Sequence, residues 1–100
     1  MIKKIAVIAA IAFSTCANAE VNNTWYAGTT YLGTVTTQGL TWRCSGGTCI
    51  LRGPYGKGLN MSICQELSQK VGGLSYYYNE TGMTWSDKKN QDLLNQCNKN

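Results

Sequence analysis

The sequence predicts a small α+β domain cross-linked by disulfide bonds, and three observations lead to this fold class. Four cysteines follow an apparent export signal. A Gly-Gly pair separates two stretches of alternating apolar and polar residues, as in a β-hairpin. Two later stretches carry apolar residues at helical spacing. The expected order is ββαβα: an antiparallel hairpin, a helix, one further strand and a second helix, with both helices packed on one face.

Residues 1–19 have the three parts of a secretory signal peptide. Lys3 and Lys4 begin it, an apolar run covers residues 5–13, and small residues lead to Ala19. The run is shorter than the ~20 apolar residues that a membrane-spanning helix needs. We therefore expect cleavage near Ala19 and a protein that is periplasmic or extracellular.

A lipoprotein signal is the competing interpretation of this leader, with Cys16 as the lipidated residue. Such signals place Leu three positions before the cysteine and Gly or Ala directly before it, whereas this chain has Phe13 and Thr15 there. The sequence therefore favours the loss of Cys16 with the leader.

Composition limits both the core and the class of partner. Removal of Lys3 and Lys4 leaves seven basic and five acidic residues, a net charge of +2. No Lys/Arg stretch is interleaved with aromatic residues, so a nucleic-acid partner is not expected. The only Phe lies in the leader, which leaves Trp and Tyr as the main large core residues. Such a small domain is expected to need covalent cross-links.

Residues 20–38 form a Thr- and Gly-rich N-terminal arm before the domain at 39–100. Only Trp25-Tyr26 and Tyr31-Leu32 are strongly apolar there. The sequence leaves open whether this segment adds an extended strand or lies as a loose arm.

The hairpin predicts the first disulfide. A two-residue turn at Gly46 and Gly47 places Cys44 directly opposite Cys49, in a pair close enough for an S–S bond. Trp42 falls on the same face as the two cysteines, so the turn and the apolar pattern agree.

A first helix is predicted over residues 61–71. Asn60 can cap its start, and Gly72 and Gly73 can end it. Its apolar stripe includes Cys64, which therefore points toward the core.

A second helix is predicted to start near Ser86 or Asn90. Leu93 and Cys97 are four residues apart and lie on one face of that helix. Both remaining cysteines thus point inward, and we expect a bond between Cys64 and Cys97 that links the two helices.

A third strand is predicted from its aromatic residues over 74–78. Alternation puts Tyr76 and Tyr78 on one face and Tyr77 on the other. The tyrosines form either a platform for a sugar or peptide or, as is more common, core rings with one exposed ring.

The sequence contains no catalytic, metal-binding or cofactor motif. His is absent, which excludes Ser-His-Asp and Cys-His sites, and the cysteine spacing fits neither a zinc site nor a C-x-x-C redox centre. The glycines of the loop at 53–58 do not form a phosphate-binding motif, because Lys57 is followed by Gly58. Glu80 and Asp87 could pair as catalytic carboxylates, but acids are ordinary at such turn and cap positions. We expect no enzyme, no metal and no cofactor.

The function that remains is binding. We expect a small exported, non-enzymatic module for a protein or glycan partner, an enzyme inhibitor being one version. Arg and Tyr dominate interface energetics, so the expected contact residues are Arg43, Arg52, Tyr55, Lys57 and Tyr77. The alternative is a secreted effector or membrane-active toxin. That function needs a cationic amphipathic surface, which a net charge of +2 does not favour, and no stable membrane insertion is expected.

A set of motifs also supports this view of the chain. They are Trp42-Arg43-Cys44, Cys49, Cys64-Gln65-Glu66-Leu67, Gly73-Leu74 and Leu94-Asn95-Gln96-Cys97-Asn98. The run resembles small exported, cysteine-containing proteins of proteobacteria that have no assigned function. The resemblance implies the ββαβα order and export, and it implies no active site. The tyrosine run and the Thr-rich segment before Gly39 depart from the pattern.

Overall fold

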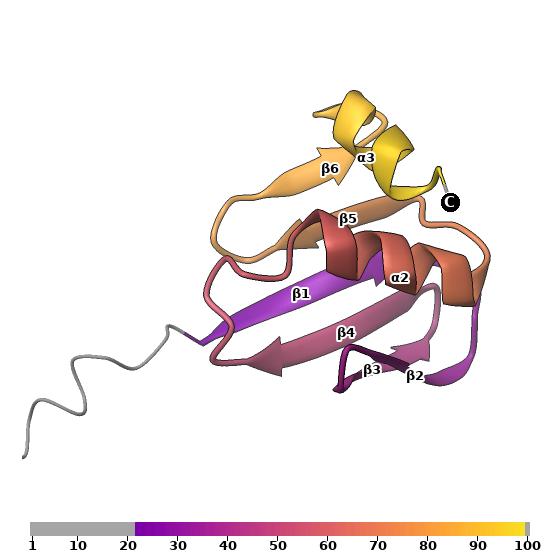
Figure 1. Cartoon of the computed structure of the whole chain (residues 1–100), viewed down its shortest axis with the longest axis vertical. Helices are drawn as coiled ribbons and strands as arrows, with labels where there is room; N and C mark the ends of the chain where they lie inside the picture. Colours follow the sequence, from indigo (N-terminus) through magenta and orange to yellow (C-terminus); the bar gives the residue numbers. More distant parts are fainter. Residues whose placement is uncertain (1–21, 100) are drawn as a thin grey trace, which may run out of the picture.

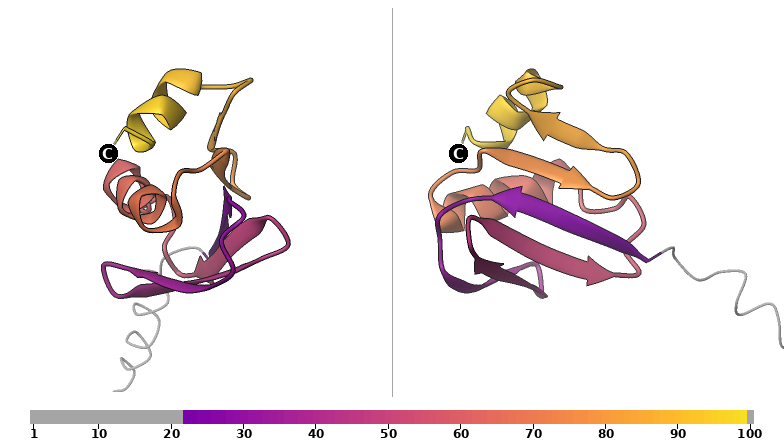
Figure 2. Two further views of the ribbon diagram at one scale, coloured as in Figure 1. Left: turned by 90° about the vertical axis from the view of Figure 1, so that its right-hand side faces the viewer. Right: turned by 180° about the vertical axis from the view of Figure 1, so that it is seen from behind.

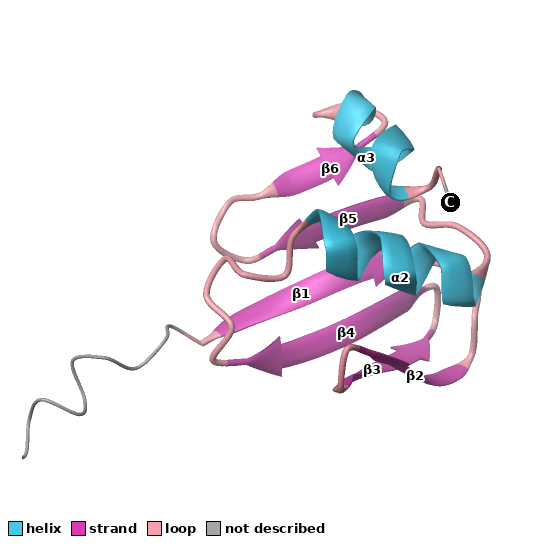
Figure 3. Cartoon of the chain, viewed as in Figure 1, coloured by secondary structure: helices cyan, strands magenta, loops and turns pink. Residues whose placement is uncertain are grey.

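The computed structural model describes residues 22–99, so the predicted leader and its cleavage site lie outside the described residues. The described chain forms an antiparallel sheet with two helices on one of its faces (Figures 1 and 3). The elements are β1 Asn23–Gly28, β2 Gly33–Thr37, β3 Leu40–Ser45, β4 Thr48–Gly53, α2 Met61–Val71, β5 Tyr76–Asn79, β6 Thr84–Ser86 and α3 Gln91–Cys97.

The sheet has six strands in the order β2-β3-β4-β1-β5-β6. The α+β class and the placement of both helices on one face match the expectation, but the predicted order ββαβα was wrong because it lacked β1, β2 and β6. Segment 20–38 supplies the first two of these strands. β1 pairs with β4 along its whole length and with β5 on its other side, so it joins the two halves of the sheet.

Tyr77 lies at the centre of the core on the helix-covered face of the sheet. Its ring centroid is 5.4 Å from that of Trp25, 6.1 Å from Trp42 and 5.6 Å from Trp85. The phenol donates a 2.9 Å hydrogen bond to the carbonyl of Leu59, and burial raises the pKa of Tyr77 far above its ordinary value. Each ring pair of this kind adds about 0.5–1.5 kcal/mol beyond the burial of its area.

The indole groups of the core differ in their polar contacts. Trp42 Nε1 donates a 2.9 Å hydrogen bond to Thr37 Oγ1, which is also buried. Trp25 Nε1 is buried without an acceptor among the described residues. A core made of Trp and Tyr thus carries polar groups that a purely aliphatic core would lack.

The first helix has the predicted bounds, 61–71. Ile63, Cys64 and Leu67 are buried against the sheet, and Gly72 ends the helix in the left-handed conformation (φ 88°) with its N–H bonded to the Ser68 carbonyl. The predicted side-chain cap was wrong, because Asn60 makes no capping hydrogen bond.

The second helix, α3, begins directly after Asn90, one of the two predicted starts. Asn90 itself has a left-handed backbone (φ 57°), and its Nδ2 donates a 2.9 Å hydrogen bond to the Thr84 carbonyl. Within residues 22–99, no helix has the length and apolar character needed to cross a membrane.

Both predicted disulfide pairings are present. Cys44 lies opposite Cys49 in the register of β3 and β4 and is bonded to it across the Gly46-Gly47 turn. Cys64 of α2 is bonded to Cys97 of α3, with the Cα atoms 5.6 Å apart. The first bond closes a local hairpin, whereas the second joins the two helices over 33 positions of sequence.

Removal of the inter-helix disulfide should cost more stability than removal of the hairpin disulfide. The chain-entropy relation gives about 4 kcal/mol for the Cys64–Cys97 loop and about 2 kcal/mol for the Cys44–Cys49 loop. We expect the double variant Cys64→Ala/Cys97→Ala to lose about twice as much unfolding free energy as Cys44→Ala/Cys49→Ala. Urea titrations followed by tryptophan fluorescence would measure both losses, and equal losses would contradict the argument from loop length.

Candidate functional site

The sheet face opposite α2 and α3 carries no helix among the described residues, and we call it the open face (Figure 2). The register of neighbouring strands places one residue from each strand in a continuous row across this face. In strand order, the row consists of Thr34, Arg43, Ile50, Tyr26, Tyr78 and Thr84. The row is the structural framework of the candidate site.

Three tyrosines form a cluster on the open face. The rings of Tyr26 and Tyr78 are stacked, with centroids 4.8 Å apart and an interplanar angle of 23°. Tyr76 leans on Tyr78 at 5.4 Å and 41°, and its hydroxyl lies 2.5 Å from that of Thr48. All three rings are half-buried. They are therefore held in place and still accessible.

The close approach of Tyr76 to the sheet depends on Gly28. A Cβ at this position would overlap the ring of Tyr76 and the hydroxyl of Ser75. Glycine has no Cβ, so the ring can lie directly over the backbone of β1.

The phenol of Tyr78 stays protonated over a wider pH range than an ordinary tyrosine. Desolvation is the main cause of its raised pKa, and the neighbouring phenols of Tyr76 and Tyr26 raise the pKa further. Its hydroxyl is thus a neutral group that can both donate and accept hydrogen bonds.

Arg43 and Ile50 continue the row beyond the tyrosines. Ile50 is 43% exposed and is one of three large apolar residues that are exposed to solvent within residues 22–99. Arg43 is exposed, and no ion pair reaches it within the described part of the chain. The row therefore combines aromatic, aliphatic and cationic groups.

Arg52 lies at one side of the tyrosine cluster and is bound to Glu80. Its Nη1 is 2.6 Å from Glu80 Oε2 and also donates a hydrogen bond to Thr24 Oγ1. The Thr24 N–H donates to the same carboxylate oxygen at 2.8 Å. The hydrogen bond from Arg52, followed by that from Thr24, holds the pKa of Glu80 below its ordinary value.

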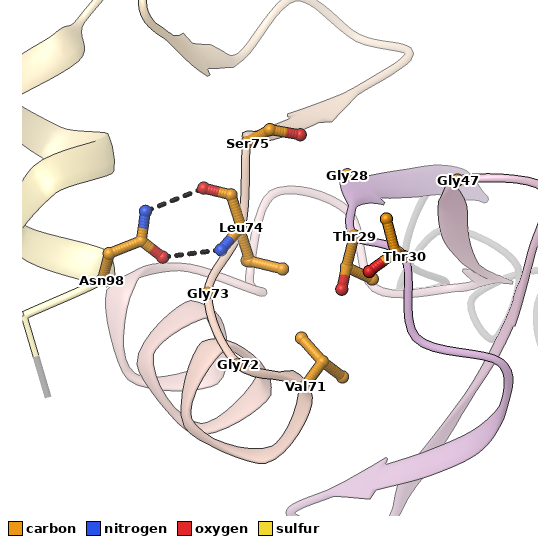
Figure 4. Close-up of a pocket in the computed structure, with 10 residues that line it drawn as sticks. All are labelled: Gly28, Thr29, Thr30, Gly47, Val71, Gly72, Gly73, Leu74, Ser75 and Asn98. Atoms are coloured by element: carbon orange, nitrogen blue, oxygen red, sulfur yellow. Dashed lines mark hydrogen bonds between the residues drawn. The ribbon is translucent and has the colours of Figure 1, made fainter.

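A shallow pocket of about 500 Å³ lies at the end of the sheet where β1, the β3–β4 turn and the end of α2 meet (Figure 4). No charged side chain lines it, and four of its lining residues are glycines. The lining residues are Gly28, Thr29, Thr30, Gly47, Val71, Gly72, Gly73, Leu74, Ser75 and Asn98.

Asn98 closes this region by pairing with the backbone of Leu74. The N–H of Leu74 donates to Asn98 Oδ1 and Asn98 Nδ2 donates to the carbonyl of Leu74, both at 2.8 Å (Figure 4). The hydroxyl of Ser68 donates to the same Oδ1 at 2.7 Å. Asn98 thus ties the end of α3 to α2 and to the segment that leads into β5.

Comparison with known proteins gives a family but no activity. Residues 5–99 match the family model described as "Family of unknown function (DUF8200)". The chain belongs to this family. No curated protein and no solved structure matches it. Any statement about function must therefore come from the geometry of the chain itself.

The structure divides the five predicted contact residues among three places. Arg43 and Arg52 lie on the open face, on β3 and β4. Tyr55 and Lys57 lie in the loop between β4 and α2, where Tyr55 packs against the core. Tyr77 was wrong as a contact residue, because it is completely buried under the helices.

Three contact candidates on the open face were not among the five expected contact residues, although the tyrosine run was considered as a platform: Tyr26, Tyr76 and Tyr78. The alternation of the tyrosine run did place Tyr76 and Tyr78 on the face opposite Tyr77. The signal that could have identified the open face is Trp25, since a buried Trp in β1 forces its neighbour Tyr26 outward.

The structure places Glu80 and Asp87, the two acids considered as a pair, in different settings. The carboxylate of Glu80 is bound to Arg52, and Asp87 follows β6 at a bend. Within residues 22–99, no three His, Cys, Asp or Glu side chains are grouped so as to hold a metal ion.

Replacement of Glu80 should change the pH dependence of stability. The lowered pKa means that the ionised carboxylate stabilises the folded state at neutral pH and that this contribution is lost as the pH falls through the folded-state pKa. We expect the melting temperature of Glu80→Gln to fall less than that of the wild type on acidification. Calorimetry between neutral and acidic pH would measure the melting temperatures of both proteins. Asp92→Asn is the control, because Asp92 makes no ion pair in the described part of the chain. Parallel curves for wild type and Glu80→Gln would contradict this role.

Loss of the Asn98 side chain should destabilise the fold by about 1–2 kcal/mol, since it removes three hydrogen bonds from a partly exposed site. Asn95→Ala is the matched control, because Asn95 is exposed on the same helix and makes no side-chain hydrogen bond in the described chain. Chemical denaturation of both variants would test this. Equal stability of the two variants would show that the pairing with Leu74 contributes nothing.

Proposed function

We propose that the chain is an exported, non-enzymatic binding module whose open face contacts a protein or glycan partner. The observation that supports this most is the uncovered row of the sheet, which brings Tyr26, Tyr78, Ile50 and Arg43 side by side. Tyrosine and arginine are enriched among the residues that dominate binding energy.

The tyrosine cluster is suited to binding because its side chains are already ordered. Tyr26 and Tyr78 are stacked, and the hydroxyl of Tyr76 is hydrogen-bonded to Thr48. Immobilising a free side chain on binding costs about 0.5–1.5 kcal/mol, and a ring that is already fixed avoids most of this cost. Covalent bonds also stiffen the scaffold behind this face, since one disulfide joins β3 to β4 and the other joins the two helices.

Two further features support the compartment and the absence of catalysis. Disulfides persist in oxidising compartments, which agrees with cleavage of the predicted leader near Ala19 and a periplasmic or extracellular location. The sequence has no His, and the carboxylate of Glu80 is paired with Arg52.

A capture experiment tests this function. The oxidised chain would be immobilised and exposed to an envelope extract of its own host, in parallel with a glycan array. We expect a stoichiometric partner that is retained by the wild type and reduced by at least about tenfold in affinity by Arg43→Ala or Tyr78→Ala, since contacts of this kind contribute about 2 kcal/mol or more.

The loop between β4 and α2 provides a matched control. Lys57→Ala removes an exposed cationic side chain outside the open face and should leave capture unchanged. Capture that disappears in Lys57→Ala but survives in Arg43→Ala and Tyr78→Ala would place the binding surface elsewhere. If the oxidised chain captures nothing beyond what the chain with reduced disulfides captures, the result would count against a binding module altogether.

A further inference from the structure

The two edges of the sheet differ in how their outward backbone groups are satisfied. In the β5–β6 hairpin, Trp85 pairs with Tyr77, so Thr84 and Ser86 face away from β5. The carbonyl of Thr84 accepts a 2.9 Å hydrogen bond from Asn90 Nδ2, and the N–H of Ser86 donates a 2.7 Å hydrogen bond to the carbonyl of Lys89. The connection from β6 to α3 therefore covers this edge.

The edge formed by β2 is much less covered. Gln38 and Gly39 both have positive φ (47° and 84°) and form a two-residue turn that Thr37 and Leu40 close. Every second residue of β2 then bonds to β3, which leaves the N–H and C=O groups of Thr34 and Thr36 facing outward.

Among the described residues, only one of these four outward groups has a partner. The Thr36 carbonyl accepts a 2.7 Å hydrogen bond from Lys70 Nζ, while both N–H groups and the carbonyl of Thr34 have none. Leu32, directly before the strand, is 72% exposed, and β2 itself carries no charged side chain. Edge strands that do not self-associate are commonly protected by charge, proline or a covering segment, and here Lys70 alone supplies such protection.

We propose that β2 is a self-association edge, and that a second copy of this chain adds its own β2 antiparallel to it, forming a continuous sheet across a two-fold axis. The strand is self-complementary in this arrangement. With Val35 on the axis, Thr34 of one copy lies opposite Thr36 of the other. The N–H of Thr36 can then bond to the free carbonyl of Thr34, and the N–H of Thr34 to the carbonyl of Thr36 once Lys70 Nζ shares or leaves that carbonyl.

The charges near the edge permit this pairing. Lys70, the cation closest to the strand, is paired with Glu66 at 3.2 Å, so it brings little net charge to the contact. Arg43 lies one strand inward from Thr34. Three strand spacings of ~4.8 Å across the sheet and two residues along it would put the two Arg43 residues of a dimer about 16 Å apart. That separation exceeds the Debye length of ~8 Å at physiological salt, and the repulsion between them is largely screened.

Sedimentation equilibrium of the exported chain with both disulfides formed tests the proposal. A contact through one short strand is small, and we expect a monomer–dimer equilibrium in roughly the micromolar to millimolar range. Thr36→Pro removes one outward N–H and no bond to β3, and the extended Val35 before it suits a following proline. This variant should stay monomeric at every concentration.

Thr84→Pro is the matched control, because it places the same substitution at the first residue of the opposite, covered edge. It should dimerise like the wild type. A wild type that is monomeric up to about 1 mM overturns the proposal, as does a folded Thr36→Pro variant that dimerises with unchanged affinity.

Amide exchange of the wild type gives an independent readout that does not depend on a variant folding. In a monomer, the N–H groups of Thr34 and Thr36 face solvent and exchange fast, whereas that of Val35 is protected by β3. We expect the exchange of Thr34 and Thr36 to slow as the protein concentration rises. Fast exchange at concentrations where a dimer forms would assign the dimer to another surface. This test involves no external partner, so its failure would leave the proposed binding function of the open face untouched.

Discussion

The inward direction of Tyr77 is the constraint on which the two faces of the sheet depend. This ring contacts three tryptophans and bonds to the Leu59 carbonyl, so β5 cannot turn over without exposing the centre of the core. The period of two along a strand then forces Tyr76 and Tyr78 to the opposite side. One alternation thus builds the core on one face and the tyrosine cluster on the other.

The helices stay on one face because several independent links hold them there. The Cys64–Cys97 bond joins α2 to α3, and Asn98, the next residue, bonds to Ser68 and to the backbone of Leu74. On the α3 side, all of these contacts come from two neighbouring residues, Cys97 and Asn98. They fix α3 beside α2, and the opposite face of the sheet is left open as a consequence.

The sequence predicted the structure correctly where a short segment determines its own conformation, as in a tight turn or an amphipathic helix. The Gly46-Gly47 turn set the register that pairs Cys44 with Cys49, and the spacing of apolar residues set the bounds of α2. It was uninformative for β1, whose buried residues include Asn23 and Thr24. Asn has a low strand preference, and a buried polar pair gives no apolar alternation to identify a strand. β1 forms because the strands on both of its sides supply its hydrogen bonds, which is a tertiary effect.

The same limitation explains the error at the candidate site. Alternation within 74–78 separated Tyr77 from its neighbours but did not say which side faces the core. That decision needs Trp25 and Trp85 on the adjacent strands, and the predicted topology contained neither strand. Arg43 and Arg52 were placed among the contact residues on residue type alone, and nothing in their local sequence showed that they would share a face with Tyr26.

The open face and the β2 edge are related by the geometry of the sheet. Antiparallel pairing of two β2 strands within one sheet would require a two-fold axis perpendicular to the sheet at the contact. Seven strand spacings would separate Tyr26 of one copy from Tyr26 of the other, and neighbouring strands are each rotated by roughly 20–25°. Because this twist accumulates, the two tyrosine clusters of the proposed dimer would point in different directions. A multivalent partner would gain effective concentration from both clusters only if its own binding sites followed that twist.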